Sequence, residues 1–192
     1  MAEKRIAGLR YPDDKQFMVV VGDLLYEPVD CIVNAANSGL SHGGGVAAAI
    51  AEAAGSKLED ECDRIILTQG KVPLTNSVVT TAGNLPFKGV IHAVGPRMGD
   101  GDEERKLART LILAFQQAHM RQWASLAFPG ISSGIFAVPY QICAKAYLQA
   151  VTEFFDLYPE TSLRTIRLCL FEGPLLDAVE AQLQAHRPQT QR

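Results

Sequence analysis

The sequence has no apolar run that approaches the roughly 20 residues needed to span a bilayer. Its first residues, Met-Ala-Glu-Lys-Arg, are followed by no apolar stretch of the kind found in signal peptides. Basic and acidic residues are interspersed and the net charge is −3, which gives no large positive field for general nucleic-acid binding. We therefore expect a cytoplasmic protein without membrane or general nucleic-acid partners.

Cysteine is scarce, and none of the four cysteines belongs to a Cys-x-x-Cys pair. Three of them lie within apolar runs typical of a core, and we interpret all four as reduced packing residues: Cys31, Cys62, Cys143 and Cys169. The sequence also has no His/Cys spacing typical of a zinc site. We therefore expect no bound metal and no cofactor.

The sequence does have enough apolar material for one core, since 47% of its 192 residues are hydrophobic. No repeat, low-complexity segment or linker divides it. We expect one monomeric domain over residues 1–192, with its core at about 17–186. The ends, 1–5 and 187–192, are polar and are expected to be loosely held.

Short runs rich in β-branched residues alternate with longer segments of helical period, which predicts an α/β layer architecture. Several of the short runs are apolar throughout, as expected for strands covered on both faces. The predicted strands are 17–21, 31–34, 77–81, 90–94, 125–128 and 165–171. The predicted helices are 46–54, 57–69, 103–121, 140–156 and 175–186.

The densest chemical signal is segment 33–50, in which Asn34 and Asn37 precede three consecutive glycines, Gly43 to Gly45, and an alanine-rich helix. Glycine lets backbone amides approach a ligand closely, and a helix N-terminus favours anions. The arrangement suits a phosphate-bearing sugar, with asparagines that can hydrogen-bond ribose hydroxyls. The plainer alternative is a flexible turn before a packed helix, because the motif is neither a Walker loop nor Gly-x-Gly-x-x-Gly.

A second loop of small residues, 128–136, follows the strand predicted at 125–128 and reads Phe-Pro-Gly-Ile-Ser-Ser-Gly-Ile-Phe. Such a loop exposes backbone N–H groups at the carboxyl end of a strand, where open α/β sheets bind ligands. Two such loops facing each other could grip a diphosphate from both sides. Neither loop contains Lys or Arg, so neutral amides would supply most of the donors.

Four segments, in this order along the chain, resemble the macrodomain family of the His-Gly-Gly-Gly-Val-Ala type. They are Val21-Gly22-Asp23, the Asn-Ala-Ala-Asn and glycine segment at 34–47, Ile-His-Ala-Val-Gly-Pro at 91–96, and the loop 128–136. The resemblance covers about residues 17–171. It implies a three-layer α/β/α sandwich around a mixed, mostly parallel sheet of six or seven strands, with ADP-ribose in a cleft at the strand ends.

The resemblance also implies which residues contact the ligand. Asp23 would accept a hydrogen bond from the adenine amine beside the apolar Leu24, and Phe171 would flank adenine; taken alone, Asp23 would indicate a turn and Phe171 a core aromatic. Asn34 would hold the glycine loop in shape. The remaining implied contacts are Asn37, Gly43, Gly44, Gly45 and Val46 around the distal ribose, and Ser132, Ser133, Gly134, Ile135 and Phe136 around the diphosphate, with the Phe136 ring covering that ribose.

The resemblance leaves the activity open between an enzyme and a binding module. Macrodomains that resemble the hydrolase branch most strongly carry Asp after Gly-Val, where it helps to activate water, and this chain has Ala47 there. The branch that shares the His-Gly-Gly-Gly-Val-Ala form is nonetheless associated with removing ADP-ribose from aspartate and glutamate. Our main expectation is therefore a mono-ADP-ribosyl hydrolase acting on proteins, with O-acetyl-ADP-ribose or ADP-ribose 1″-phosphate as further substrates.

Two alternatives accompany this expectation. The first is a non-catalytic reader that binds ADP-ribosylated proteins or free ADP-ribose, and Ala47 is its best support. The second is a sensor of related nucleotides such as NAD metabolites.

The catalytic residues implied for the enzyme are Asn37, His42 and Gly45. Asn37 would orient the distal ribose, the amides at Gly45 would favour a strained bound conformer, and water near the α-phosphate would attack the anomeric carbon. His42 could assist proton transfer because its ordinary pKa is near neutral, but we favour a loop residue that shapes the glycine turn. We interpret His92, in an apolar strand, as a hydrogen-bonded core histidine.

Overall fold

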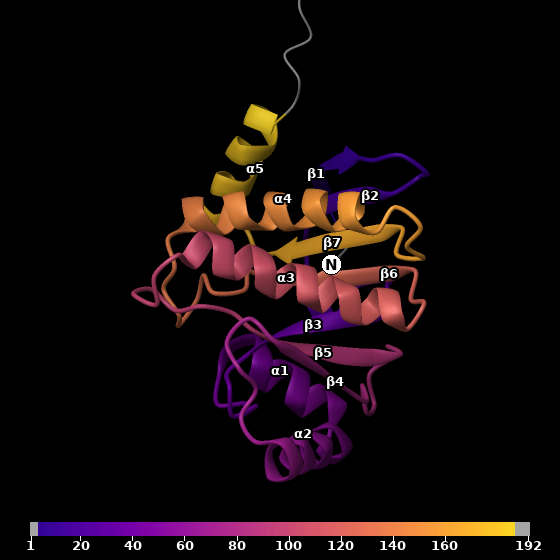
Figure 1. Ribbon diagram of the computed structural model, residues 1–192, viewed down its shortest axis with the longest axis vertical. Coiled ribbons are helices and arrows are strands. Elements are labelled where there is room, and N and C mark those ends of the chain that lie inside the picture. The colour runs from indigo at the N-terminus through magenta and orange to yellow at the C-terminus, as the bar shows by residue number, and fades with distance from the viewer. Residues whose placement is uncertain (1–3, 187–192) are drawn as a thin grey trace, which may run out of the picture.

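The computed structural model describes residues 4–186, which form a mixed seven-stranded sheet with helices on both faces (Figure 1). The predicted three-layer α/β/α sandwich is confirmed. The strand order across the sheet is β1-β2-β7-β6-β3-β5-β4. The strands are β1 (Lys4–Arg10), β2 (Gln16–Val21), β3 (Cys31–Ala36), β4 (Ser77–Thr80), β5 (Gly89–Val94), β6 (Ser125–Phe128) and β7 (Thr165–Leu170).

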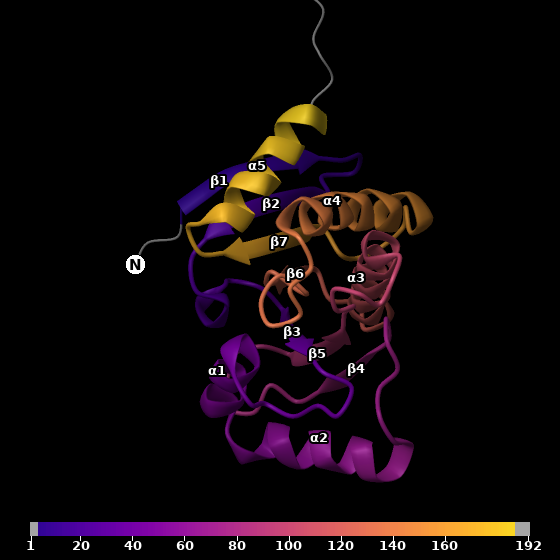
Figure 2. The same ribbon diagram turned by 90° about the vertical axis from the view of Figure 1, so that its left-hand side faces the viewer.

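The two faces of the sheet are buried against different helices (Figure 2). Ile50 and Leu58 of α1 and α2 lie in one buried cluster with Ile32 of β3. Phe154 of α4 lies in a second cluster, shared with α3 and α5, on the side to which Val33 of β3 points. Adjacent residues of one strand thus enter opposite cores, as the pleat requires. The helices are α1 (Gly45–Ala54), α2 (Ser56–Gln69), α3 (Glu103–Met120), α4 (Tyr140–Leu157) and α5 (Pro174–His186).

Five neighbouring strands, β2, β7, β6, β3 and β5, run parallel to one another. The outer strands β1 and β4 pair with them in the antiparallel sense. Parallel strands have their carboxyl ends at the same edge of a sheet. In Figure 1 the arrow of β7 points to the left, toward this carboxyl edge, and Figure 2 faces the same side. The segments that follow all five strands therefore start from one edge.

The strand β1 and the short 3₁₀ helix Leu24–Tyr26 are the elements that the sequence did not predict. The strand is the larger of the two. Its segment contains three basic residues and a glycine, which weakens a strand signal but suits a sheet edge, where charge discourages pairing with another chain. The expectation of a loosely held end over 1–5 is wrong for residues 4 and 5, which belong to β1. Residues 1–3 and 187–192 lie outside the described part of the chain. The other predicted elements agree with the structure to within two residues at each end.

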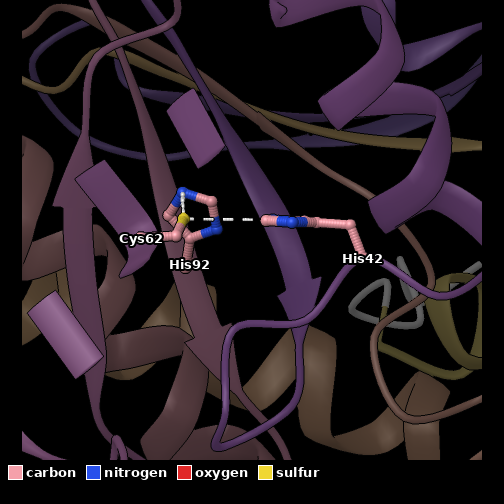
Figure 3. A group of neighbouring side chains, drawn as sticks. All are labelled: His42, Cys62 and His92. Atoms are coloured by element: carbon pink, nitrogen blue, oxygen red, sulfur yellow. Dashed lines mark hydrogen bonds between the residues drawn. The ribbon is translucent and has the colours of Figure 1, made fainter. Parts of the chain in front are cut away.

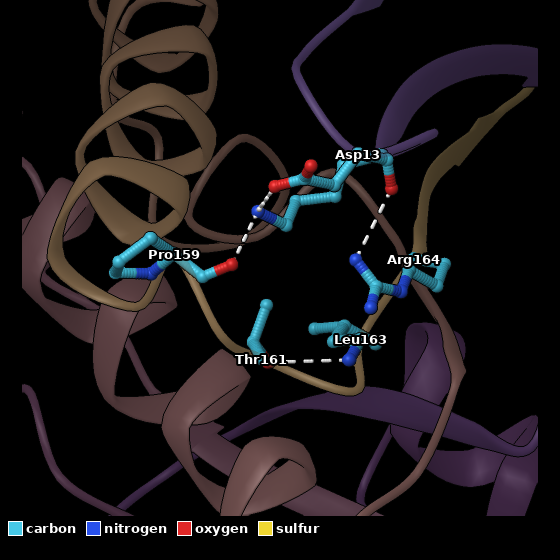
Figure 4. A network of polar contacts seen from close by, with 6 residues as sticks. Asp13, Pro159, Thr161, Leu163 and Arg164 are labelled. Carbon is cyan, nitrogen blue, oxygen red and sulfur yellow. Dashed lines mark hydrogen bonds and ion pairs between the residues drawn. The ribbon is translucent and has the colours of Figure 1, made fainter.

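At the amino edge of the sheet, the turn between β1 and β2 is tied to the loop between α4 and β7 (Figure 4). Lys15 is 3% exposed, and its Nζ donates to the carbonyl oxygen of Pro159 at 2.6 Å and lies 3.5 Å from the Asp13 carboxylate. Arg164 donates to the carbonyl oxygen of Asp13 at 3.1 Å. A buried ammonium needs such partners because desolvating an unpaired charge is costly. The contacts hold the starts of β2 and β7 side by side.

Asp30 joins the amino ends of several strands. Its carboxylate accepts from the N–H of Ala124 at 2.7 Å and pairs with Lys88 at 2.8 Å, while its own N–H donates to Ser125 Oγ at 2.9 Å. Burial by itself would raise the pKa of this carboxyl. The hydrogen bonds from Lys88 and Ala124, with the charge of Lys88, outweigh burial and lower the pKa below its ordinary value.

We predict that Asp30→Asn lowers the free energy of unfolding at neutral pH and that the deficit disappears in acid. A carboxyl whose pKa is depressed by folding contributes stability above its unfolded pKa of about 3.9 and loses it as pH falls through the lower folded pKa. Urea unfolding between about pH 7 and pH 2 measures the difference. Asp14→Asn, at an exposed position of the β1–β2 turn, is the control. A deficit of Asp30→Asn that persists unchanged in acid would contradict the prediction.

Candidate functional site

The segments at the carboxyl edge lie in the order set by the sheet. Asp23 follows β2, and Phe171 follows the neighbouring β7. The loop 129–139 follows β6, and the segment 37–44 follows β3, which pairs with β6. The two loops of small residues are therefore neighbours, with Asp23 and Phe171 to one side of both.

The glycine loop, residues 43–45, leads directly into α1. Gly45 has a φ of +59°, a left-handed value that favours glycine. A Cβ on any of the three glycines would meet no described atom within 4 Å, and no described side chain caps the start of α1 at Gly44. The first N–H groups of α1 thus have no side-chain cap at Gly44 and lie at the positive end of the helix dipole. This combination can bind an anion through neutral donors.

Asn37 closes the turn that precedes the glycine loop. Its Nδ2 donates to the carbonyl oxygen of Ser41 at 3.0 Å and to the hydroxyl of Ser41 at 2.8 Å, and its Oδ1 accepts from the N–H of Ser41 at 3.1 Å. The N–H of Leu40 donates to the Asn37 carbonyl oxygen at 3.0 Å. Asn37 thus shapes the turn, and its implied role toward a ribose stays a prediction.

The loop after β6 is fixed by the core beneath it. The hydroxyl of Tyr147, buried in α4, donates to the carbonyl oxygen of Ile131 at 2.6 Å. Ser132 has a φ of +67°, and its Oγ is buried without a partner among the described residues. Gly95, which follows β5, packs against this serine: a Cβ on Gly95 would overlap Ser132 Oγ and lie 2.9 Å from Ile131 Cγ2. The loop conformation therefore depends on the absence of a side chain at Gly95.

The other end of the edge carries an acidic and an aromatic side chain. Asp23 is exposed, and its Oδ1 accepts from the N–H of Leu25 at 3.0 Å, which caps the short 3₁₀ helix Leu24–Tyr26. Leu24 itself is 6% exposed and packs in the core, so Asp23 is the member of this pair that faces solvent. Phe171 is 77% exposed, far more than a core aromatic. Both groups are open to a ligand.

His42, Cys62 and His92 meet beside the start of the glycine loop (Figure 3). Sγ of Cys62 lies 3.9 Å from Nε2 of His42 and 3.8 Å from Nε2 of His92. At the other ring nitrogen of His92, Nδ1 lies 3.1 Å from Nδ2 of Asn34, whose side chain is buried. Oγ1 of Thr80 lies 2.8 Å from Nε2, the nitrogen that also faces Cys62. The interpretation of His92 as a hydrogen-bonded core residue is confirmed. Sequence spacing gave no sign of the cluster, because a loop, a helix and a strand supply its members.

Burial controls the protonation of this cluster. It lowers the pKa of His92 to about 3, with a smaller contribution from nearby His42. It also lowers the pKa of His42, against the opposing charges of Glu59 and Asp63. The same burial raises the pKa of Cys62 to about 11. At neutral pH the two rings are therefore neutral and the thiol keeps its proton.

Comparison with known families gives a match to the family described as Macro domain over residues 33–147, more than half of the chain. The chain belongs to the macrodomain family. The matched region runs from β3 into α4 and so contains the glycine loop, Gly95 and the loop after β6. The resemblance found in the sequence is thus confirmed.

Relatives of this macrodomain occur in bacteria and in humans. A macro domain-containing protein of Listeria monocytogenes is 40% identical over 159 residues, which are 82% of this chain and 90% of the relative. An uncharacterized protein of Thermotoga maritima is 44% identical over 157 residues, 81% of this chain and 26% of the relative. The human protein mono-ADP-ribosyltransferase PARP14 is 37% identical over 171 residues, 88% of this chain and 9% of the relative. The chain thus spans about a quarter of the Thermotoga protein and about a tenth of the human one.

Solved structures of other macrodomains share the fold. A mutant of the Oceanobacillus iheyensis macrodomain, described as carrying ADPR, has a TM-score of 0.85 and 28% identity, covering 96% of this chain and 98% of its own. The Trypanosoma brucei macrodomain in complex with ADP-ribose has a TM-score of 0.77 and 24% identity, covering 86% and 68%. The second likeness is a likeness of fold alone.

Arg97 is a residue of this macrodomain's carboxyl edge that sequence reasoning missed. Its guanidinium lies 4.7 Å from the centroid of the Phe136 ring, and the N–H of Met98 donates to the carbonyl oxygen of Phe136 at 2.8 Å. These contacts join the segment after β5 to the loop after β6. Arg97 lies outside both small-residue loops in the sequence, and only the fold brings it next to one of them.

We predict that Gly95→Ala destabilises the macrodomain by about 1 to 3 kcal/mol, the usual cost of overpacking, because the added methyl overlaps Ser132 Oγ. Adding Ser132→Gly removes that oxygen and relieves the positive φ, so the double variant should recover part of the loss. Urea unfolding of both single variants, the double variant and the wild type gives the coupling. Gly134→Ala, where a Cβ meets no described atom within 4 Å, is the control. Strictly additive losses would contradict the described packing.

Proposed function

We propose that this macrodomain binds ADP-ribose along the carboxyl edge of its sheet and removes it from aspartate and glutamate side chains of mono-ADP-ribosylated proteins. The observation that carries the proposal is the order of chemical groups along that edge. Asp23 and Phe171 stand at one end, and the loop after β6 comes next. The turn closed by Asn37 and the glycine loop stand beyond it.

ADP-ribose presents groups in a matching order: adenine, diphosphate and distal ribose. Adenine requires an aromatic face and an acceptor for its amine, which the exposed Phe171 ring and the Asp23 carboxylate supply. The diphosphate requires N–H donors, which the start of α1 and the loop after β6 offer. The Arg97 guanidinium over Phe136 adds positive charge on the same side. The Oceanobacillus iheyensis macrodomain described with ADPR supports this choice of ligand.

The proposed reaction is hydrolysis of the ester between the distal ribose and a carboxylate side chain. Water attacks the anomeric carbon, the bond from that carbon to the carboxylate oxygen breaks, and the water gives up a proton to solvent. A carboxylate is a stable anion when it leaves, so the reaction needs no strong general acid. Orientation of the ribose and backbone N–H groups near the developing charge are the contributions required of the protein. Ala47, in place of the acid of other hydrolases, is compatible with that modest demand.

The rival function is a reader that binds ADP-ribosylated proteins without turnover. Ala47 is 7% exposed and packs in the core, so no acidic group stands at this point of α1. His42 directs Nε2 toward Cys62, and this orientation favours a shaping role over proton transfer. A sensor of related nucleotides is the third alternative. We also propose that the protein is monomeric and cytoplasmic.

We predict that Asp23→Ala weakens ADP-ribose binding by about 1.5 to 3 kcal/mol, the scale of a hydrogen bond to a charged group. Calorimetric titration with ADP-ribose measures this loss. Asp23→Asn keeps an oxygen that can cap the following 3₁₀ helix, and so separates the charge from the capping role. Asp60→Ala, on the exposed surface of α2, is the control. Unchanged affinity in Asp23→Ala would contradict the adenine assignment.

For the enzyme we predict that the wild type releases labelled ADP-ribose from a glutamate-modified protein and that Asn37→Ala loses turnover more than binding. Ser41→Ala removes one partner of Asn37 while keeping its amide, so it reports how much of the loss comes from the shape of the turn. Release is followed by loss of label, and binding by calorimetry. If the wild type binds ADP-ribose tightly but releases none from the modified protein, the protein is a reader. If Asn37→Ala loses turnover and binding affinity equally, Asn37 only holds the ligand.

A further inference from the structure

Three potential metal-binding side chains lie behind the glycine loop. Cys62 of α2 is 2% exposed, His92 of β5 is fully buried, and His42, which directly precedes Gly43, is partly buried. Their ligand atoms all lie within 4.8 Å of one another, and Figure 3 shows the three side chains beside one another. A thiol and two imidazoles are the type of ligands that zinc prefers in proteins.

Although the sequence spacing led us to expect no bound metal, we infer that His42, Cys62 and His92 form a binding site for Zn²⁺. With Zn–S bonds of about 2.3 Å and Zn–N bonds of about 2.0 to 2.1 Å, tetrahedral coordination places sulfur and nitrogen ligands about 3.6 Å apart. The distances from Cys62 Sγ to the two Nε2 atoms are 3.9 Å and 3.8 Å. These two distances exceed the tetrahedral value by only a few tenths of an ångström, and all three ligand atoms lie within 4.8 Å of one another. Three protein ligands leave a fourth position for water.

The surroundings of His92 suit a metal ligand. Zinc binds a ring nitrogen without a proton, so coordination through Nε2 requires the proton on Nδ1 and an acceptor there. Asn34 stands at Nδ1 with Nδ2 at 3.1 Å, and its Oδ1 is buried without a partner in the described part of the chain. A half-turn of the amide brings this oxygen to Nδ1. Thr80, now 2.8 Å from Nε2, keeps the Thr81 carbonyl oxygen as a partner at 3.0 Å when zinc takes its place.

Zinc binding is balanced by the loss of one proton, because the Cys62 thiol becomes a thiolate and its proton passes to solvent. The two imidazoles bind as neutral ligands. An ion would enter from the side of His42, the only partly exposed member of the three, where a Cβ on the neighbouring Gly43 would meet no described atom within 4 Å.

Bound zinc would fasten the glycine loop to α2 and β5. His42 is joined covalently to the first of the glycines that precede α1, so holding its ring restricts the freedom of the loop. Any effect of this restriction on ADP-ribose binding rests on the proposed function, whereas zinc binding itself does not. The site would act as a clamp on the loop, at a distance from the ligand's reacting atoms.

The test uses untagged, reduced protein freed of metal by a chelator. We expect one Zn²⁺ per chain by elemental analysis and competitive titration, a higher thermal midpoint with zinc, and, with Co²⁺ as a probe, a thiolate-to-metal charge-transfer band. Cys62→Val and His42→Gln should each lower zinc affinity at least about tenfold, and Cys62→Val should abolish the band. Cys169→Val, another buried cysteine, and His119→Gln should behave as the wild type.

Wild-type protein that binds no zinc would overturn the inference, as would zinc affinity that is equal in the wild type, Cys62→Val and His42→Gln. Circular dichroism and urea unfolding of each metal-free variant separate loss of the site from loss of the fold. ADP-ribose titration with and without zinc distinguishes the two proposals. Zinc binding without ADP-ribose binding would contradict the proposed function and support the metal site.

Discussion

Parallel pairing of β2, β7, β6, β3 and β5 is the constraint on which the rest of this structure depends. Each of these strands is covered on both faces, so the chain must cross between neighbouring parallel strands through helices rather than tight turns. The same pairing gathers the segments that follow the strands at one edge. Two of those segments are rich in glycine and serine, so backbone amides at this edge are not shielded by large side chains. The architecture and the functional site therefore have a single physical origin.

Burial of polar groups in the sheet is the second feature that links fold and site. His92, Asn34 and Thr80 sit on neighbouring strands among apolar residues, and each makes at least one hydrogen bond within the group. Such a network is tolerated because its hydrogen bonds offset part of the cost of burial, and it is sensitive because a buried polar atom such as Oδ1 of Asn34, which has no partner among the described residues, is costly. Its position next to His42 ties the interior of the sheet to the glycine loop.

Much of the fold could be predicted from the sequence, for a physical reason. Strands such as β3, β5 and β6 are buried on both faces and therefore appear as predominantly apolar runs. The strand β1 lies at the edge, is rich in basic residues and lacks that signature. The glycine loop and the loop after β6 could be found because unusual backbone leaves unusual residues in the sequence. The pairing of Gly95 with Ser132, the placement of Arg97 on Phe136 and the His42–Cys62–His92 cluster could not, because each depends on strand order, which periodicity does not encode.

The reliance of the carboxyl edge on backbone N–H groups has a consequence for how the protein can diverge. A main-chain N–H donor is retained when almost any side chain is exchanged. Substitutions on the surface of the loop therefore leave its anion-binding donors in place. The sensitive positions are those that set conformation, such as Gly45 with its left-handed φ and Gly95 with no room for a methyl. Selection on such a site acts through shape, and relatives can keep the same chemistry while sharing few of the residues that line it.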